Sequence, residues 1–177
     1  MRRVSVVGTT GAGKTTFARE LSGRLGVPHV ELDALFWGPR WTMAEREVFR
    51  ARSTRATADD AWVVDGNYSA LVRDLIWSRA DTVVWLDYSL WRIVWQLVPR
   101  IIARIRDQQE LWPGTGNRES VRSAILTKDP LVWFAIRTHH RRRRRLAEGL
   151  ALPVYEEWWP PRSVACGNVA FEMKQSR

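Results

Sequence analysis

The sequence has little that permits crosslinking or membrane insertion. Cys166 is the single cysteine among 177 residues, so an internal disulfide is excluded and a cytoplasmic location is the default expectation. The most apolar segment, residues 83–105, is interrupted by charged residues and by Pro99. It does not qualify as a membrane span, and no membrane partner is expected. Two arginines lead directly into the first apolar run, so we also expect no signal peptide.

Internal repeats, linkers and low-complexity tracts are missing apart from one arginine run, so we expect a single domain over residues 1–177. Lysine is scarce too, because only three of the 28 basic residues are lysine, and arginine carries the net charge of +9. This charge suits nucleic acid, an acidic membrane surface or a highly phosphorylated small substrate. A content of 45% hydrophobic and 27% charged residues is ordinary for a globular protein and does not indicate disorder.

Glycine, by contrast, is concentrated near the N-terminus, with three glycines in residues 8–13. Residues 8–15, GTTGAGKT, fit the pattern G-x-x-x-x-G-K-[ST] at every fixed position. An apolar run at residues 4–7 predicts a buried strand before the loop, and apolar residues at helical spacing predict a helix after Lys14. A glycine-rich turn that merely joins strand to helix is the weaker interpretation.

In such a loop, successive backbone N–H groups wrap a phosphate chain and the helix N-terminus adds partial positive charge. Lys14 is expected to reach the β- and γ-phosphates, and the Thr15 hydroxyl to hold Mg²⁺. The sequence therefore predicts a site for ATP and Mg²⁺. The predicted nucleotide-binding residues are Gly8, Thr9, Thr10, Gly11, Ala12, Gly13, Lys14, Thr15 and Thr16.

Strand and helix patterns alternate along the rest of the chain. Strands are predicted at residues 27–33, 61–68, 81–89 and 152–158, and helices at 43–58, 70–80, 90–106 and 131–149. This alternation predicts an α/β fold with a parallel sheet of about five strands and helices on both faces. Ligands of such sheets bind beyond the carboxyl ends of the strands.

Three aspartates follow predicted strands and are therefore candidates for the site. Asp65 is interpreted as the carboxylate that positions Mg²⁺, and Asp87 as a helix N-cap. Asp33 is expected to orient or deprotonate the phosphoryl acceptor, with a capping role as the alternative. Trp37 and Trp41 in the next loop are candidates for the wall of an acceptor pocket, although ordinary packing also explains them.

Arginine is the second strong feature of the sequence. Arg92, Gln96, Arg100 and Arg104 recur at every fourth residue of a predicted helix, which leads to a Gly/Pro/Asn loop and Arg118. A solvated helix face would explain the stripe. We favour an arginine-bearing lid over about residues 100–125 that closes over phosphates, with Arg100, Arg104 and Arg118 as its catalytic side chains.

A further run, HHRRRRR at residues 139–145, lies late in its predicted helix. Cations there are favourable to the helix dipole without any ligand. Some of these arginines are candidates for facing the nucleotide, and Arg137 with the run is the candidate for binding nucleic acid. The two histidines are interpreted as surface residues and not as metal ligands.

The motifs GTTGAGKTT, LDALFW, WVVDGNYS, RADTVVWLDYS and GNRES together resemble the adenylate-kinase-related P-loop kinases, closest to the group labelled topology modulation proteins. The resemblance implies a three-layer kinase fold with a lid. It places Asp65 and Asn67 beside Mg²⁺ and the acceptor. Asn67 stands where monophosphate kinases continue with Phe-Pro-Arg, so Arg73 is a candidate for gripping the acceptor. Asp33 is similar to the acceptor aspartate of shikimate- and gluconate-type kinases.

We therefore expect a phosphotransferase that moves the ATP γ-phosphoryl group to a small-molecule or nucleotide acceptor. The predicted acceptor-binding residues are Asp33, Trp37, Asp65, Asn67 and Arg73. A nucleotide-dependent nucleic-acid-binding regulator is possible but not favoured, and an NTPase that only hydrolyses is the other alternative.

Overall fold

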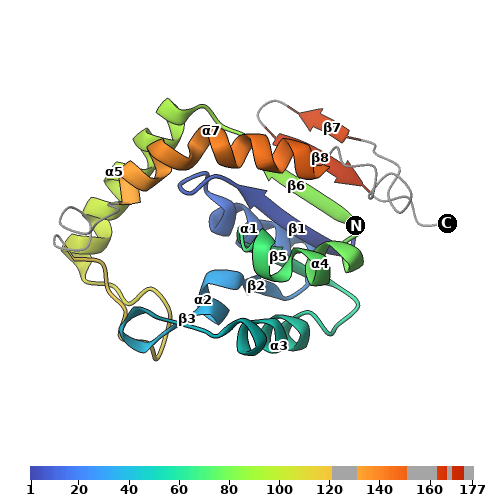
Figure 1. Cartoon of the computed structure of the whole chain (residues 1–177), viewed down its shortest axis with the longest axis horizontal. Coiled ribbons are helices and arrows are strands. Elements are labelled where there is room, and N and C mark those ends of the chain that lie inside the picture. The colour runs from blue at the N-terminus through green and yellow to red at the C-terminus, as the bar shows by residue number, and fades with distance from the viewer. Residues whose placement is uncertain (121–130, 151–162, 167–168, 174–177) are drawn as a thin grey trace.

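A six-stranded sheet forms the centre of the protein, in the order β2-β5-β1-β6-β8-β7. We describe residues 1–120, 131–150, 163–166 and 169–173 of a computed structural model (Figure 1). Strands β1 (Arg3–Gly8), β2 (His29–Glu31), β5 (Trp62–Asp65) and β6 (Thr82–Leu86) are parallel. Strands β8 (Val169–Met173) and β7 (Ser163–Cys166) continue the sheet, with β8 antiparallel to β6 and β7 antiparallel to β8. The fold is therefore α/β with a mostly parallel sheet.

Helices lie on both faces of this sheet. Val4 and Val6 of β1 pack with Ala18 of α1 (Lys14–Leu25), whereas Val7 packs in a second cluster with Phe49 of α3 (Arg46–Ala56) and helix α4 (Ser69–Arg79). Both clusters are buried, which explains why the parallel strands are continuous runs of apolar residues. The end of α7 (Leu131–Leu150) lies on the α4 side.

Helix α5 (Leu90–Asp107) packs against α7 through one apolar stripe. Ile93, Leu97 and Ile101 of this stripe are buried as the sequence predicts, and they meet Ala135 of α7. The helix is a single element even though it contains Pro99. Figure 1 shows α7 crossing the molecule on the side opposite α3, with α5 beside its first turns.

The segment after β2 departs from the predicted strand and loop. Strand β2 ends at Glu31, and residues 32–36 form the short helix α2 (Leu32–Phe36). Strands β3 (Trp37–Gly38) and β4 (Thr42–Met43) then form a small antiparallel hairpin around the 3-10 turn η1 (Pro39–Trp41). Asp33 consequently lies in a helix and not at the end of a strand, because the leucines and Phe36 of α2 pack on the core of the α3–α4 face.

The C-terminal part of the sheet also differs from the prediction. The parallel part has four strands instead of about five, and the two added strands are antiparallel. The strand predicted at residues 152–158 lies outside the described residues, as do residues 121–125 of the predicted lid. Within the described part of the chain, none of the helices has the length and apolar character needed to cross a membrane.

Candidate functional site

The glycine-rich loop connects β1 to α1 at the carboxyl edge of the sheet. Gly11 and Gly13 have φ angles of +90° and +78°, which favour glycine, and Gly13 is the N-cap residue of α1. A Cβ atom on Gly11 would lie 2.9 Å from Cγ2 of Ile93, so the loop also packs closely on α5. Residues 8–15 thus have the strand–loop–helix context that the motif requires.

Three polar side chains, from β2, β5 and the first turn of α1, meet at Asp65. Asp65 ends β5 and lies opposite Val6 of β1 and Glu31 of β2. The Thr15 hydroxyl donates a hydrogen bond to Asp65 Oδ2 over 2.7 Å, and Nε2 of His29 lies 2.9 Å from Asp65 Oδ1. Asp65 is only 2% exposed. Both of its carboxylate oxygens are therefore held in fixed positions.

Lys14 lies among charges of both signs. Its Nζ donates a hydrogen bond to the carbonyl oxygen of Thr9 over 3.2 Å. Burial lowers the pKa of Lys14 to about 8, while Asp33 and Asp65 oppose the shift and Arg142 and Arg100 add to it. The two aspartates and two arginines thus lie within electrostatic range of one ammonium group.

Asp33 is hydrogen-bonded to Tyr68, a partner that the sequence pattern does not indicate. The Tyr68 hydroxyl donates a hydrogen bond to Asp33 Oδ1 over 2.5 Å. Burial raises the pKa of Tyr68, and the neighbouring Asp33 carboxylate raises it further. Tyr68 therefore stays a hydrogen-bond donor, and it orients the carboxylate of Asp33.

Asn67 is bound to the glycine-rich loop. Its Oδ1 accepts a hydrogen bond from the Gly8 N–H over 3.2 Å, and its Nδ2 donates to the Gly8 carbonyl oxygen. Because both polar groups of the side chain contact the backbone of one residue, Asn67 fixes the start of the loop. It lies in the predicted site, in a position that supports the loop.

The three arginines of the predicted lid have different surroundings. Arg100 is half-buried, and its Nε has no hydrogen-bond partner within the described residues. Burial lowers the pKa of Arg100, and the positive charge of the neighbouring Arg104 lowers it further. Arg104 donates to Glu119 over 3.0 Å. Arg118 is exposed, and its backbone pairs with Glu110. Of the three, only Arg100 is thus shown within electrostatic range of Asp33 and Lys14.

The loop after α5 packs onto the β3–β4 hairpin. Asn117 is 1% exposed, and its side chain accepts a hydrogen bond from the Trp41 N–H and donates one to the Gly38 carbonyl, both over 2.9 Å. The ring of Trp41 lies 5.7 Å from that of Trp112 and 5.7 Å from that of Trp37. Trp37, predicted to line an acceptor pocket, is thus engaged in aromatic packing.

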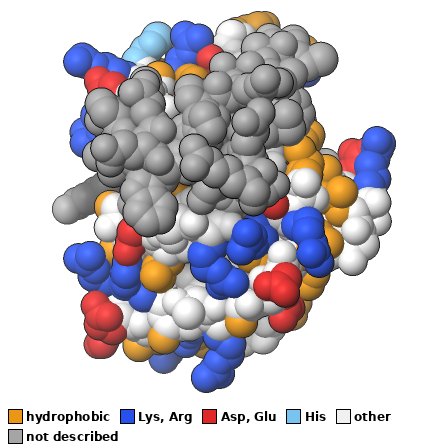
Figure 2. Space-filling model, turned by 90° about the vertical axis from the view of Figure 1, so that its right-hand side faces the viewer, with side chains coloured by type: hydrophobic (Ala, Val, Ile, Leu, Met, Phe, Trp, Pro, Cys, Tyr) orange, Lys and Arg blue, Asp and Glu red, His pale blue; other side chains and the backbone are white. Residues whose placement is uncertain are grey.

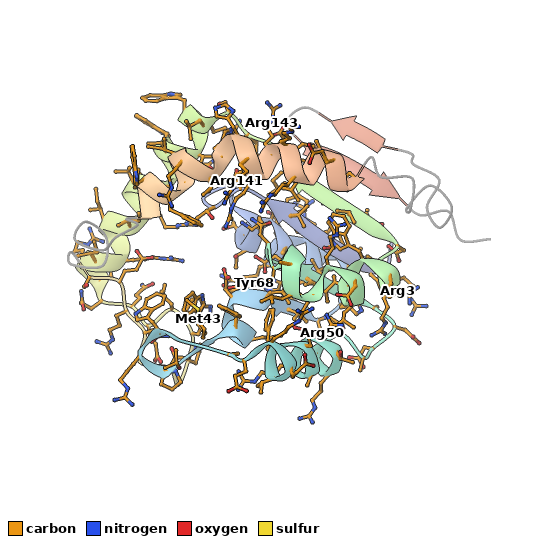
Figure 3. All side chains as sticks on the ribbon, in the orientation of Figure 1. Arg3, Met43, Arg50, Tyr68, Arg141 and Arg143 are labelled. Atoms are coloured by element: carbon orange, nitrogen blue, oxygen red, sulfur yellow. The ribbon has the colours of Figure 1, made fainter. Side chains whose placement is uncertain are left out.

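The arginine run on α7 divides into two sets. Arg143 forms two hydrogen-bonded contacts of 2.9 and 2.7 Å with Asp87 Oδ2, and Arg144 pairs with Glu148 over 2.6 Å. Arg141, Arg142 and Arg145 instead line a cavity between α4 and α7. Figure 3 shows Arg141 on the side of α7 that faces the centre of the molecule and Arg143 on the opposite side.

Two of these contacts bear on the predictions. Arg142 Nη1 donates to the Thr10 hydroxyl over 3.2 Å, which places a guanidinium group beside the glycine-rich loop. Asp87 pairs with Arg143, and Ser89 occupies the N-cap position of α5. The prediction of Asp87 as an N-cap is therefore wrong, because the docked helix α7 provides it with an ionic partner.

The residues around Thr15 fit a magnesium ion that is shared with a phosphate chain. Thr15 and Asp65 offer oxygen atoms at one place, and Mg²⁺ commonly takes one or two protein ligands together with water and substrate phosphates. Among the described residues there is no group of three or more His, Cys, Asp or Glu side chains arranged for a metal. This donor set suits Mg²⁺ with a nucleotide better than a metal held by protein alone.

Comparison with known proteins gives no assignment, since no protein-family model and no curated protein matches the chain. The function is therefore argued from the residues of the site.

Proposed function

We propose that the protein is an ATP- and Mg²⁺-dependent phosphotransferase with an adenylate-kinase-like arrangement of phosphate loop and lid. The observation that carries the proposal is the convergence of Lys14, Thr15 and Asp65 at a glycine-rich loop, with Asp33 and Arg142 in electrostatic range of the lysine. Opposite charges set around one anion-binding loop are the arrangement that phosphoryl transfer needs.

Each residue of the loop region has a defined role in this proposal. The backbone N–H groups of residues 8–16 bind the phosphate chain, and Lys14 neutralises its β- and γ-phosphates. Arg142 and Arg100 supply further positive charge from α7 and α5. Thr15 and Asp65 would hold Mg²⁺, which would offset the negative charge of the phosphate chain. The residues therefore position a triphosphate and stabilise charge that develops during transfer.

The acceptor is activated at Asp33. Its carboxylate, oriented by Tyr68, accepts the proton of the acceptor hydroxyl as that oxygen bonds to the γ-phosphorus. The bond from this phosphorus to the bridging oxygen breaks, and ADP leaves. His29, on the far oxygen of Asp65, keeps the magnesium carboxylate in position.

The positions of the α7 arginines favour this proposal over a nucleic-acid-binding regulator. Arg141, Arg142 and Arg145 line the cavity, and Arg143 and Arg144 are paired with carboxylates. The run therefore does not form one open basic surface. On the described part of the face in Figure 2, basic and acidic side chains are interspersed.

The test is a transfer assay with ATP, Mg²⁺ and a panel of nucleoside monophosphates and small hydroxyl compounds, in which ADP and phosphorylated product are followed. We expect a phosphorylated acceptor with wild-type protein and no turnover with Lys14→Ala. Arg19→Ala is the matched control, because Arg19 is an exposed cation on the same helix. ADP with free phosphate alone would indicate an NTPase, and unchanged turnover in Lys14→Ala would refute the proposed site.

A further inference from the structure

A cavity of about 510 Å³ lies between α4 and α7, beside the glycine-rich loop. Ser5 and Val7 of β1 and Gly66 at the end of β5 contribute to its lining. Asn67 and Tyr68 lie at the same cavity, and these residues contact Gly8 and Asp33 respectively. The cavity therefore lies next to the atoms that the proposed function assigns to phosphoryl transfer.

The charge of this cavity is strongly positive. Four arginines line it, Arg73, Arg141, Arg142 and Arg145, against the single carboxylate Glu148. Glu148 is already paired with Arg144, which is not among the lining residues. Within the described part of the chain, Arg141, Arg142 and Arg145 have no ion pair with a carboxylate. Clustered guanidinium groups repel one another, so an anionic ligand would stabilise the cluster.

Apolar side chains line the wall of the cavity between these arginines. Val72, Ile76 and Trp77 from α4 line it together with Phe134 and Leu146 from α7. The Arg73 guanidinium lies 5.1 Å from the centre of the Trp77 ring, and a Cβ atom on Gly149 would lie 2.8 Å from its Nη1. Gly149 thus leaves room for Arg73 at the wall of the cavity. Apolar walls with a few convergent charges are typical of small-molecule sites.

Aromatic side chains pack together around Tyr68 and in the β3–β4 hairpin. Phe36, Phe49 and Tyr68 form an aromatic cluster with ring centres 4.7–5.2 Å apart, and Trp41 of the hairpin packs on Trp112. Trp37, which the sequence indicates for the acceptor pocket, packs edge-on against Phe36 and Trp41. Tyr68, the hydrogen-bond partner of Asp33, lines the cavity between α4 and α7.

From this geometry we infer that the α4–α7 cavity binds a small anionic molecule with a compact apolar body, whose carboxylate or phosphate group is held by Arg73, Arg141 and Arg145. As a binding site the inference stands on the cavity alone. The statement that the bound molecule is the phosphoryl acceptor rests on the proposed function.

The test measures binding in the absence of ATP, so that none of the probes can be phosphorylated. Phenyl phosphate and benzoate both have an apolar ring and an anionic group but no free alcohol, and benzyl alcohol is the neutral control. Isothermal titration of wild-type protein is expected to show binding of at least one anionic probe and none of benzyl alcohol. The probe that binds distinguishes a phosphate ester from a carboxylate as the natural ligand.

Variants show whether the probe binds in this cavity or at the glycine-rich loop. The double variant R141Q/R145Q is expected to bind the probe at least about tenfold more weakly, since charge-assisted hydrogen bonds to the anion are lost. R143Q, on the outer side of the same helix, is expected to bind it normally. All three side chains are exposed, and equal urea midpoints would verify folding.

Lys14→Ala is expected to keep probe binding and to bind ATP at least about tenfold more weakly. Probe binding that is lost in Lys14→Ala but kept in R141Q/R145Q would place the anion at the loop and overturn the inference, with the proposed function intact. Failure of both anionic probes to bind would also overturn it. Probe binding without phosphoryl transfer to any acceptor would instead count against the proposed function.

Discussion

Three glycine-to-alanine variants in the N-terminal region distinguish the cost of a left-handed backbone conformation from the cost of a steric clash. Both costs are measured as changes in the free energy of unfolding. Gly23 lies inside α1 in an ordinary helical conformation, and an added methyl group would have nothing within 4 Å. Gly13 has a φ of +78° but equally open surroundings. Gly11 combines a φ of +90° with a Cβ position only 2.9 Å from Cγ2 of the buried Ile93. The series therefore adds one physical cost at a time.

The expected changes in the free energy of unfolding follow from these differences. Gly23→Ala should stabilise the protein by about 0.5–1 kcal/mol, because alanine loses less entropy in a helix. Gly13→Ala should destabilise it by about 1–2 kcal/mol through the left-handed conformation. Gly11→Ala carries that strain and a clash with Ile93, for a total of about 2–5 kcal/mol.

Urea unfolding followed by far-UV circular dichroism measures all three variants against wild type. The order of stability is expected to be Gly23→Ala, wild type, Gly13→Ala and Gly11→Ala. Equal stabilities of Gly11→Ala and Gly13→Ala would refute the close contact between the loop and α5. A Gly13→Ala variant as stable as wild type would refute the left-handed conformation at the start of α1.

Three further predictions follow from the site and the core. Since burial lowers the pKa of Lys14 to about 8, its ammonium form is lost as pH rises. One pH unit above that value, kcat/KM for ATP should be about tenfold below its plateau, whereas Lys14→Arg should lack this decline. Asp65→Asn should raise the Mg²⁺ concentration for half-maximal turnover about tenfold or more, and an unchanged Mg²⁺ titration would contradict its role. Leu97→Ala, at a fully buried position, should lower the free energy of unfolding by about 2–5 kcal/mol in urea, and a loss below about 1 kcal/mol would contradict the α5–α7 packing.

The local features of the fold could be predicted from the sequence. The glycine-rich loop lies between a strand and a helix because its own residues and their immediate neighbours determine that arrangement. The same holds for Ile93, Leu97 and Ile101, whose helical spacing indicates one buried face. Asp65 at the end of β5 also follows from a local apolar run.

The contacts that complete the site depend on tertiary packing. His29 and Asp65 are 36 residues apart and meet through the register of β2 with β5, and Arg142 meets Thr10 across 132 residues. The spacing of Arg141, Arg142 and Arg145 indicates that they share a helix face. Which face of α7 turns inward, however, depends on its packing against α5 and against the core on the α4 side. The sequence pattern places Asp33 at the end of a strand because a short apolar run fits both strand and helix.

The most direct test of the central claim is equilibrium binding of a non-hydrolysable ATP analogue with Mg²⁺ to wild-type protein and to Lys14→Ala, with Arg19→Ala as the control. The loop geometry predicts that wild type and Arg19→Ala bind the analogue equally. Lys14→Ala should bind at least about tenfold more weakly, because a charge-assisted contact to the phosphates is lost. Equal affinity in all three proteins, or no binding to wild type, would contradict the assignment of residues 8–16 as a nucleoside-triphosphate site.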